Sequence, residues 1–118
     1  MRVLVVEDDR DLNRQLVSAL SDAGYAVDTA FDGEEGFFLG ETEPYDIVIL
    51  DIGLPKMDGI SILEQWRRAE RNMPVIILTA DGTCDPKEKL LGLGIADFMV
   101  KPFDIDHLER TVDLWLRW

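Results

Sequence analysis

Cysteine and histidine are almost absent from this chain, since each occurs once in 118 residues. The single cysteine, Cys84, cannot form a disulfide within the chain, so we expect a reducing compartment, the cytoplasm. We interpret Cys84 as an inert thiol in a loop or at a helix start. The one histidine, His107, lies in a segment of helical periodicity, and we expect it to face solvent.

Basic residues are also scarce. Lysine and arginine number 12 against 24 acidic residues, which gives a formal net charge of −12 at pH 7. Proteins bind nucleic acids largely through clustered lysine and arginine, so this balance argues against direct binding to nucleic acid or to a membrane surface. The acidity either only keeps the protein soluble or gathers carboxylates around a cation.

Long apolar runs are missing as well. No run reaches the roughly 18–20 residues that cross a bilayer, and the opening MRVLVVEDD meets acid too soon for a signal peptide. The length suits one domain with one core, and no repeat, linker or low-complexity tract divides it. We therefore expect residues 1–118 to form a single domain, with no output domain present.

Two alternating patterns make up the rest of the sequence. Short β-branched runs indicate strands, and apolar residues at helical spacing indicate helices. The expected strands are 3–6, 25–30, 47–50, 75–78 and 98–100, and the expected helices are 12–23, 34–40, 60–66, 87–93 and 104–118. Five strands alternating with five helices predict an α/β fold, a parallel sheet with helices on both faces.

Some local features can be predicted too. Strand 25–30 alternates more than the others, so we expect it at an edge of the sheet. In helix 34–40 two glycines weaken the prediction, and the residues on or near its buried side are expected to be Phe37, Phe38 and Leu39. Trp66 belongs to the core by its spacing.

Three aspartates suit the starts of helices, namely Asp9, Asp58 and Asp104. Gly59 follows Asp58 in a turn, where we expect it to supply backbone freedom.

Polar side chains follow the strands at the points where they end. They are the pair Glu7–Asp8, then Asp51, Thr79 and Lys101. The carboxyl ends of parallel strands meet at one edge of the sheet, where ligands bind in open α/β folds. A single aspartate after a strand is more often a cap, but the companions of Asp51 favour a functional site.

This set of residues has a definite chemistry. Carboxylates on one rim repel each other unless a cation lies among them, and Mg²⁺ prefers carboxylate, carbonyl and phosphate oxygens. Lys101 adds a positive charge and Thr79 a hydroxyl, so the set could hold a phosphoryl group attached to Asp51. Phosphoryl transfer needs placement and charge neutralisation more than acid–base help, so it requires no histidine here.

Four blocks, VLVVEDD, VILDIGLPKMDG, VIILTA and VKPF, occur in this order along the chain. Together they resemble the motifs of response-regulator receiver domains of two-component signalling, and the resemblance covers essentially the whole sequence. The N-terminal part is most similar to receivers of winged-helix (OmpR/PhoB-type) transcription regulators. The resemblance implies a flavodoxin-like, doubly wound sheet of strand order 2-1-3-4-5 and a phosphorylation-dependent signalling switch.

The resemblance also implies roles for the residues that end the first and third strands. Asp51 would accept a phosphoryl group from a sensor histidine kinase. Glu7 and Asp8 match the acidic pair that holds Mg²⁺. Asp51 and the backbone carbonyl of Gly53 would complete the metal ligands of the protein.

Roles for the later motifs follow in the same way. Thr79 would bind the phosphoryl group by a hydrogen bond, Lys101 would form an ion pair with it, and the bond to Pro102 would be cis. Phe98 stands where the family has the aromatic switch residue, and without a hydroxyl it should favour the inward position. Such a protein catalyses only its own phosphorylation and dephosphorylation, and is not otherwise an enzyme.

The resemblance weakens from Asp81 onward, which indicates a recombined, engineered or divergent C-terminal third. Receivers of this kind usually dimerise through the fourth helix, fifth strand and fifth helix by crossed acid–base pairs. Lys87 and Asp97 match that network, whereas the positions that depart from it are Ala96, His107 and Thr111. Apolar surface is added near the end by Trp115 and Trp118. We therefore expect the usual dimer to be weak or altered.

Other functions stay open at this point. The leading one is a switch that controls an output domain or partner, such as a DNA-binding domain in a longer protein. An isolated or divergent receiver could act as an interaction module with weakened dimerisation, and a pseudo-receiver could bind partners without phosphorylation. A phosphatase with an aspartyl nucleophile would generally need a second aspartate at the position of Gly53.

Overall fold

The computed structural model describes residues 1–80 and 92–117. Its elements are β1 (Arg2–Val6), α1 (Arg10–Asp22), β2 (Ala26–Ala30), α2 (Gly33–Thr42), β3 (Ile47–Asp51), α3 (Gly59–Arg68), β4 (Val75–Thr79), β5 (Asp97–Val100) and α5 (Ile105–Leu116). Most of the helix expected at 87–93 lies outside the described residues, as do Asp81, Cys84, Lys87 and Trp118.

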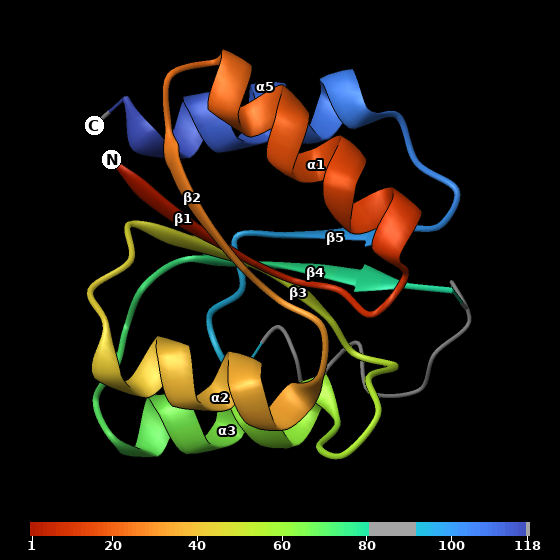
Figure 1. Cartoon of the computed structure of the whole chain (residues 1–118). Coiled ribbons are helices and arrows are strands. Elements are labelled where there is room, and N and C mark those ends of the chain that lie inside the picture. Colours follow the sequence, from red (N-terminus) through yellow and green to blue (C-terminus); the bar gives the residue numbers. More distant parts are fainter. Residues whose placement is uncertain (81–91, 118) are drawn as a thin grey trace.

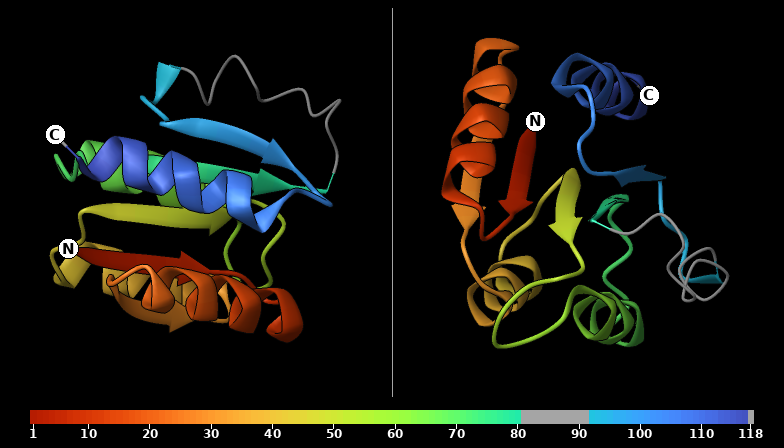
Figure 2. Two further views of the ribbon diagram at one scale, coloured as in Figure 1. Left: turned by 90° about the horizontal axis from the view of Figure 1, so that it is seen from above. Right: turned by 90° about the vertical axis from the view of Figure 1, so that its right-hand side faces the viewer.

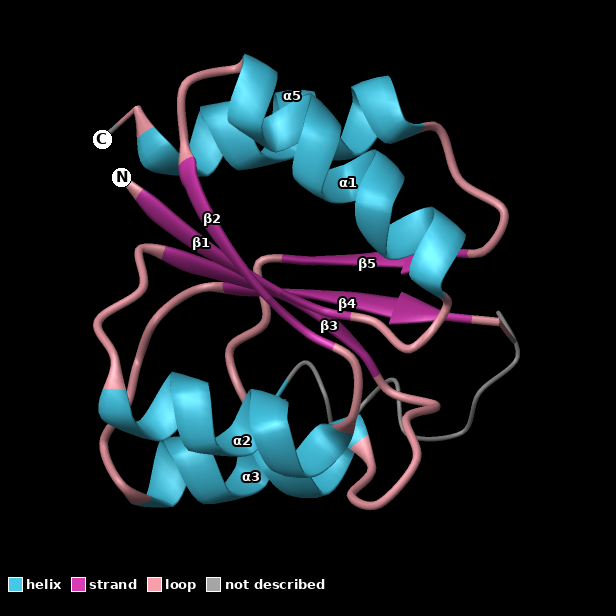
Figure 3. Cartoon of the chain, in the orientation of Figure 1, coloured by secondary structure: helices cyan, strands magenta, loops and turns pink. Residues whose placement is uncertain are grey.

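The strands form one parallel sheet in the order β2-β1-β3-β4-β5. This order confirms the predicted flavodoxin-like topology and the edge position of β2. Helices α1 and α5 cover one face of the sheet, and α2 and α3 cover the other (Figure 1, Figure 3). Figure 2 shows the same layers from two further sides, with the start of β1 and the end of α5 at one end of the molecule. Of the five helices expected, four lie in the described part of the chain.

Alternate residues of the central strands enter two separate apolar clusters, because side chains along a strand point to opposite faces. Val3 and Val5 pack beneath α1 and α5, whereas Leu4 and Val6 pack beneath α2 and α3. β1, β3 and β4 are buried along almost their whole length. The polar residues at the carboxyl ends of these three strands are therefore carried by strands that are buried on both faces. None of the described helices is long and apolar enough to cross a membrane.

Helix α2 contacts the sheet and α3 through glycines, and one of its phenylalanines faces solvent. Phe38 is 62 % exposed, so its expected burial is wrong. A Cβ at Gly36 would lie 2.5 Å from Val6 Cγ1, and a Cβ at Gly40 would lie 2.1 Å from a ring carbon of Trp66. The glycines that weaken a helix by propensity are here what lets α2 approach the sheet and α3. Trp66 is fully buried, as expected.

Aspartates cap the described helices. The predicted cap Asp58 accepts a hydrogen bond from Ser61 N at 2.9 Å, and Asp9 and Asp104 cap α1 and α5 in the same manner. Asp32 caps α2 in the same way. A carboxylate at this position satisfies free N–H groups of the first turn.

Gly59 departs from its expected role. Its φ is not in the left-handed region, so backbone freedom is not the reason for glycine there. A Cβ would lie 2.6 Å from Ile52 Cα and 2.7 Å from Asp51 O. Glycine is needed because α3 begins directly against the backbone that follows β3.

Candidate functional site

The polar residues predicted at the strand ends lie together at the carboxyl edge of the sheet. Asp51 is the last residue of β3 and Thr79 the last of β4, and each is 4 % exposed. Glu7 directly follows β1 and is fully buried, whereas its neighbour Asp8 is exposed. Lys101 directly follows β5 and is partly buried. The parallel sheet brings these side chains to one place because all of its strands end on the same side (Figure 1).

Register places Asp51, Thr79 and Lys101 beside one another. Asp51 pairs with Leu78 on β4, so Thr79 lies one residue beyond it. Thr79 pairs in turn with Val100, and its carbonyl accepts a hydrogen bond from Lys101 N at 2.7 Å. The peptide bond between Lys101 and Pro102 is cis.

Three carboxylates form the acidic part of the site. Glu7, Asp8 and Asp51 each offer an oxygen, and these oxygens all lie within 4.8 Å of one another. Asp51 Oδ1 also accepts a hydrogen bond of 2.8 Å from Gly53 N. The loop that begins at Ile52 therefore holds the Asp51 carboxylate by its backbone.

Lys101 neutralises part of this charge. Its Nζ donates a hydrogen bond of 2.8 Å to Asp51 Oδ2 and lies 2.5 Å from Glu7 Oε1. Burial lowers the pKa of the lysine, but the hydrogen bonds to Asp51 and Glu7 outweigh burial and leave the pKa raised. Lys101 therefore stays charged at neutral pH.

Burial changes the pKa of Glu7. Loss of solvent raises the pKa of its carboxyl to about 7, and the nearby Asp51 adds to this, against the lowering by Lys101 and Asp9 N. Glu7 Oε2 accepts a hydrogen bond of 3.0 Å from Asp9 N. Glu7 Oε1 has its ion pair with Lys101 but no well-aligned donor among the described residues.

The acidic cluster can hold a metal ion. Converging carboxylate oxygens are the donor set of hard divalent cations, and the buried Oε1 of Glu7 has room in its coordination for such a partner. A cation here would also relieve the repulsion between Glu7 and Asp51. The residues present therefore fit a metal site of oxygen ligands.

Sequence reasoning did not find one supporting residue, Asn13. It is buried on α1, and its Nδ2 donates to Glu7 O at 3.0 Å and toward Ala30 O at 3.4 Å. Its Oδ1 accepts a hydrogen bond of 2.6 Å from Thr29 Oγ1. The available signal was an amide on the face of a helix that is otherwise apolar. Asn13 holds the backbone that carries the first acidic pair.

Phe98, the expected switch residue, lies on β5 and is partly buried against the apolar cluster under α2 and α3.

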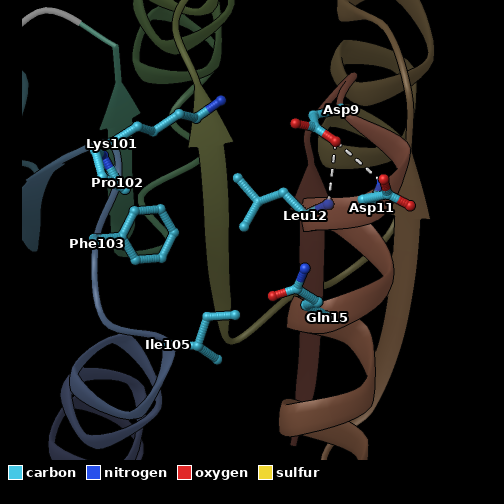
Figure 4. Close-up of a pocket in the computed structure, with 8 residues that line it drawn as sticks. All are labelled: Asp9, Asp11, Leu12, Gln15, Lys101, Pro102, Phe103 and Ile105. Carbon is cyan, nitrogen blue, oxygen red and sulfur yellow. Dashed lines mark hydrogen bonds between the residues drawn. The ribbon is translucent and has the colours of Figure 1, made fainter.

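A cavity of about 470 Å³ lies between α1 and the connection from β5 to α5, with Lys101 among its lining residues (Figure 4). Leu12, Phe103 and Ile105 give it an apolar wall, with Asp9 at one end. Of the residues predicted at the site, Lys101 and Pro102 line this cavity.

Comparison with known proteins decides the family. The profile of the response regulator receiver domain matches residues 3–113. The chain belongs to the response regulator receiver family. This receiver is 39 % identical over 117 residues to the transcriptional regulatory protein QseB of Haemophilus influenzae, covering 99 % of this chain and 53 % of QseB. It is 41 % identical to CusR of Escherichia coli, covering 99 % of this chain and 52 % of CusR.

Solved structures agree with the fold of this receiver. The receiver domain of the Francisella response regulator 1452 has a TM-score of 0.89 and 38 % identity, covering 98 % of this chain and 97 % of that one. The response regulator TrrA of Thermotoga maritima, solved in complex with Mg²⁺-BeF, has a TM-score of 0.84 and 32 % identity, covering 98 % of each chain.

The relatives also bear on the finer expectations. They are transcriptional regulators of the OmpR/PhoB type, as the N-terminal motifs implied, and this receiver spans about half of their length. The alignments continue through the C-terminal third, and the divergence expected from Asp81 onward stays a prediction. The interaction-module reading is not favoured by these relatives.

Proposed function

We propose that this receiver is a signalling switch in which Asp51 accepts a phosphoryl group from a histidine kinase in the presence of Mg²⁺. The observation that supports this most strongly is the arrangement of the three acids around Lys101. Glu7, Asp8 and Asp51 converge within 4.8 Å, and Lys101 pairs with both buried members of the cluster. Family membership supports the same function.

In the proposed step a carboxylate oxygen of Asp51 attacks the phosphorus of a phosphohistidine. The new O–P bond forms as the N–P bond breaks, and the imidazole leaves with the electron pair of that bond. Mg²⁺, held by Glu7, Asp8, Asp51 and the Gly53 carbonyl, would neutralise charge on the phosphoryl oxygens. Lys101, freed from Asp51 Oδ2, forms an ion pair with the transferred group.

Thr79 supplies a hydroxyl next to Asp51 and binds a phosphoryl oxygen in the product. Hydrolysis then restores Asp51 when water attacks the phosphorus and inorganic phosphate leaves. Both steps change only the phosphorylation state of the receiver's own Asp51, so we classify it as a switch that catalyses its own phosphorylation and dephosphorylation and not as an enzyme that turns over other substrates.

In the proposed mechanism, phosphorylation of Asp51 changes the surface around β5. Movement of Thr79 toward the phosphoryl group makes room for Phe98 to pack further inward, which changes the surface formed by β5, α5 and the residues that precede β5. In a longer protein this surface would control a DNA-binding domain, as the relatives are transcriptional regulators. The receiver itself, with its net charge of −12, would not bind DNA. The compartment that this function requires is the cytoplasm.

We also propose that the usual receiver dimer is weak or altered here. On the described part of that face, Thr111 Oγ1 donates to His107 O at 3.0 Å and so bonds within α5. Asp97 Oδ1 accepts from Phe98 N at 2.7 Å. Leu114 and Trp115 leave apolar side chains exposed on the same helix. These local hydrogen bonds and exposed apolar side chains do not supply the crossed ion pairs of the usual interface.

Labelling with acetyl phosphate tests the function. The wild-type protein should incorporate one phosphoryl group when MgCl₂ is present and none in EDTA, and Asp51→Asn should stay unlabelled. Asp22→Asn, which changes an exposed acid at the end of α1, is the matched control and should label like the wild type. No labelling of the wild type would favour a pseudo-receiver, and rapid turnover of unrelated phosphoesters would favour a phosphatase.

A further inference from the structure

Residues 30–33 join β2 to α2, and each of them contacts one of the two backbone segments that carry the acidic site. The first two contact the segment that follows β1. Ala30 O accepts a hydrogen bond of 3.1 Å from Glu7 N. The guanidinium carbon of Arg10, the first residue of α1, lies 4.4 Å from the centre of the Phe31 ring, a cation–π distance.

The next two residues contact the loop that follows β3. Gly33 N donates a hydrogen bond of 3.1 Å to Pro55 O. Asp32 Oδ2 lies 3.5 Å from Lys56 Nζ. Lys56 has φ 71°, a left-handed conformation that lysine rarely adopts, so these contacts hold the loop in a shape it would not favour alone. Figure 1 shows the connection in orange beside the yellow-green loop.

The approach of this loop depends on a missing side chain. A Cβ at Gly33 would lie 1.9 Å from Met57 O and 2.7 Å from Met57 C, which are backbone atoms that cannot turn aside. Gly53 lies in the same loop and is exposed, and its neighbour Leu54 is buried in the core. The loop is therefore fixed on both sides of its metal-ligand position by Asp51 and by residues 32–33.

We propose that residues 30–33 set the distance between the two halves of the metal site and so control Mg²⁺ affinity without touching the ion. The first two residues of the connection contact the segment that carries Glu7 and Asp8, and the last two contact the loop that carries Gly53. Asp32 and Gly33 are thus positioning residues. The inference rests on the metal role given under the proposed function, and it adds a second set of residues on which that role depends.

Mg²⁺ titration by NMR tests the proposal, with the backbone amides of Glu7 and Gly53 as reporters. Gly33→Ala should raise the Kd for MgCl₂ about tenfold, because changes in groups that orient metal ligands typically cost about 10–100-fold in affinity. Gly40→Ala is the matched control. It is the same change in the same helix, and it creates a clash with Trp66 that is remote from the loop. Its Kd should stay within about twofold of the wild type.

A second pair of variants covers the case in which Gly33→Ala does not fold. Lys56→Gly suits the positive φ but removes the ammonium, and Lys56→Arg keeps the charge. Lys56→Gly should raise the Kd about two- to fivefold, which corresponds to an exposed ion pair, and Lys56→Arg should match the wild type.

The outcomes separate this inference from the function on which it rests. A wild-type protein that binds no Mg²⁺ would contradict the metal role itself. If the wild type binds and Asp8→Asn does not, the metal role stands. Equal Kd values for Gly33→Ala and Gly40→Ala, or for Lys56→Gly and Lys56→Arg, would then overturn the proposed control by residues 30–33 alone.

Discussion

Replacing Lys101 with methionine should expose how much the acidic site depends on one positive charge. Lys101 Nζ lies between Glu7, which is fully buried, and Asp51, which is 4 % exposed. Methionine replaces the four-atom apolar stem of lysine and removes the ammonium. The variant leaves two carboxylates close together with no cation between them in metal-free protein.

The size of the effect follows from burial and depends on pH. Removing one partner of a buried ion pair costs about 3–5 kcal/mol, because a charge is left without compensation. Glu7 can avoid part of this cost by binding a proton. The pKa of Glu7 is already raised to about 7. The hydrogen bond from Lys101 lowers this pKa, so the loss of that bond will raise it further.

A folded-state pKa above the unfolded value of 4.5 means that the native state binds more protons. The stability that protonated Glu7 contributes is therefore fully present below about pH 4.5 and is lost as the pH rises through 7 and above. The difference between Lys101→Met and wild type should be about 3–5 kcal/mol at pH 8 and about 1 kcal/mol or less at pH 5. Added Mg²⁺ should return part of the loss at pH 8.

Urea unfolding in EDTA at the two pH values measures these differences, with Lys101→Arg as the variant that keeps the charge. The same measurement in MgCl₂ tests the rescue. A loss of stability that is equal at pH 5 and pH 8, and that Mg²⁺ does not change, would refute the reasoning, because it would show that Lys101 contributes by packing and not by charge.

Three further predictions follow from the fold. Gly40→Ala should destabilise the protein by about 1–3 kcal/mol in urea unfolding, because the added Cβ meets the Trp66 ring. Gly92→Ala should be near neutral, because its Cβ meets nothing within 4 Å. Equal effects of the two substitutions would contradict the packing argument. Asp58→Ala should cost about 1 kcal/mol and Asp58→Asn less. The Ser61 N–H lowers the pKa of Asp58, so the contribution of its charge should be present above about pH 4 and vanish in acid, which unfolding at pH 3 and pH 7 will show. Sedimentation with beryllofluoride and Mg²⁺ should find mainly monomer, and a strong analogue-induced dimer would count against the altered interface.

The α/β architecture and the residues at the carboxyl edge of the sheet were predictable because both follow from periodicity. Buried β-branched runs identified β1, β3 and β4, and a parallel sheet must bring their carboxyl ends together. Glu7, Asp51 and Lys101 were therefore expected to be neighbours before any distance was known. The strand order came from the resemblance to receivers, since alternation alone does not choose between doubly wound orders.

Packing details were not predictable, because a glycine gives no sign of what approaches it. Gly36 and Gly40 were read as weak helix formers, and Gly59 as a flexible turn residue, yet all of them are needed for close contact. The predicted burial of Phe38 was wrong for the same reason, since the glycines and not this ring face the neighbouring elements. Asn13 was missed because an amide on an apolar face has no motif. Such contacts become visible only when segments distant in sequence are placed side by side.

The central claim is that Asp51 is the residue that changes covalently, and locating the phosphoryl group tests it most directly. The protein is incubated with acetyl phosphate and MgCl₂, the acyl phosphate is trapped by borohydride reduction, and peptides are sequenced by mass spectrometry. The account predicts that the aspartate at position 51 is converted to homoserine in the wild type and that no other residue changes. Reduction at another carboxylate, or none at position 51 when label is incorporated, would contradict it.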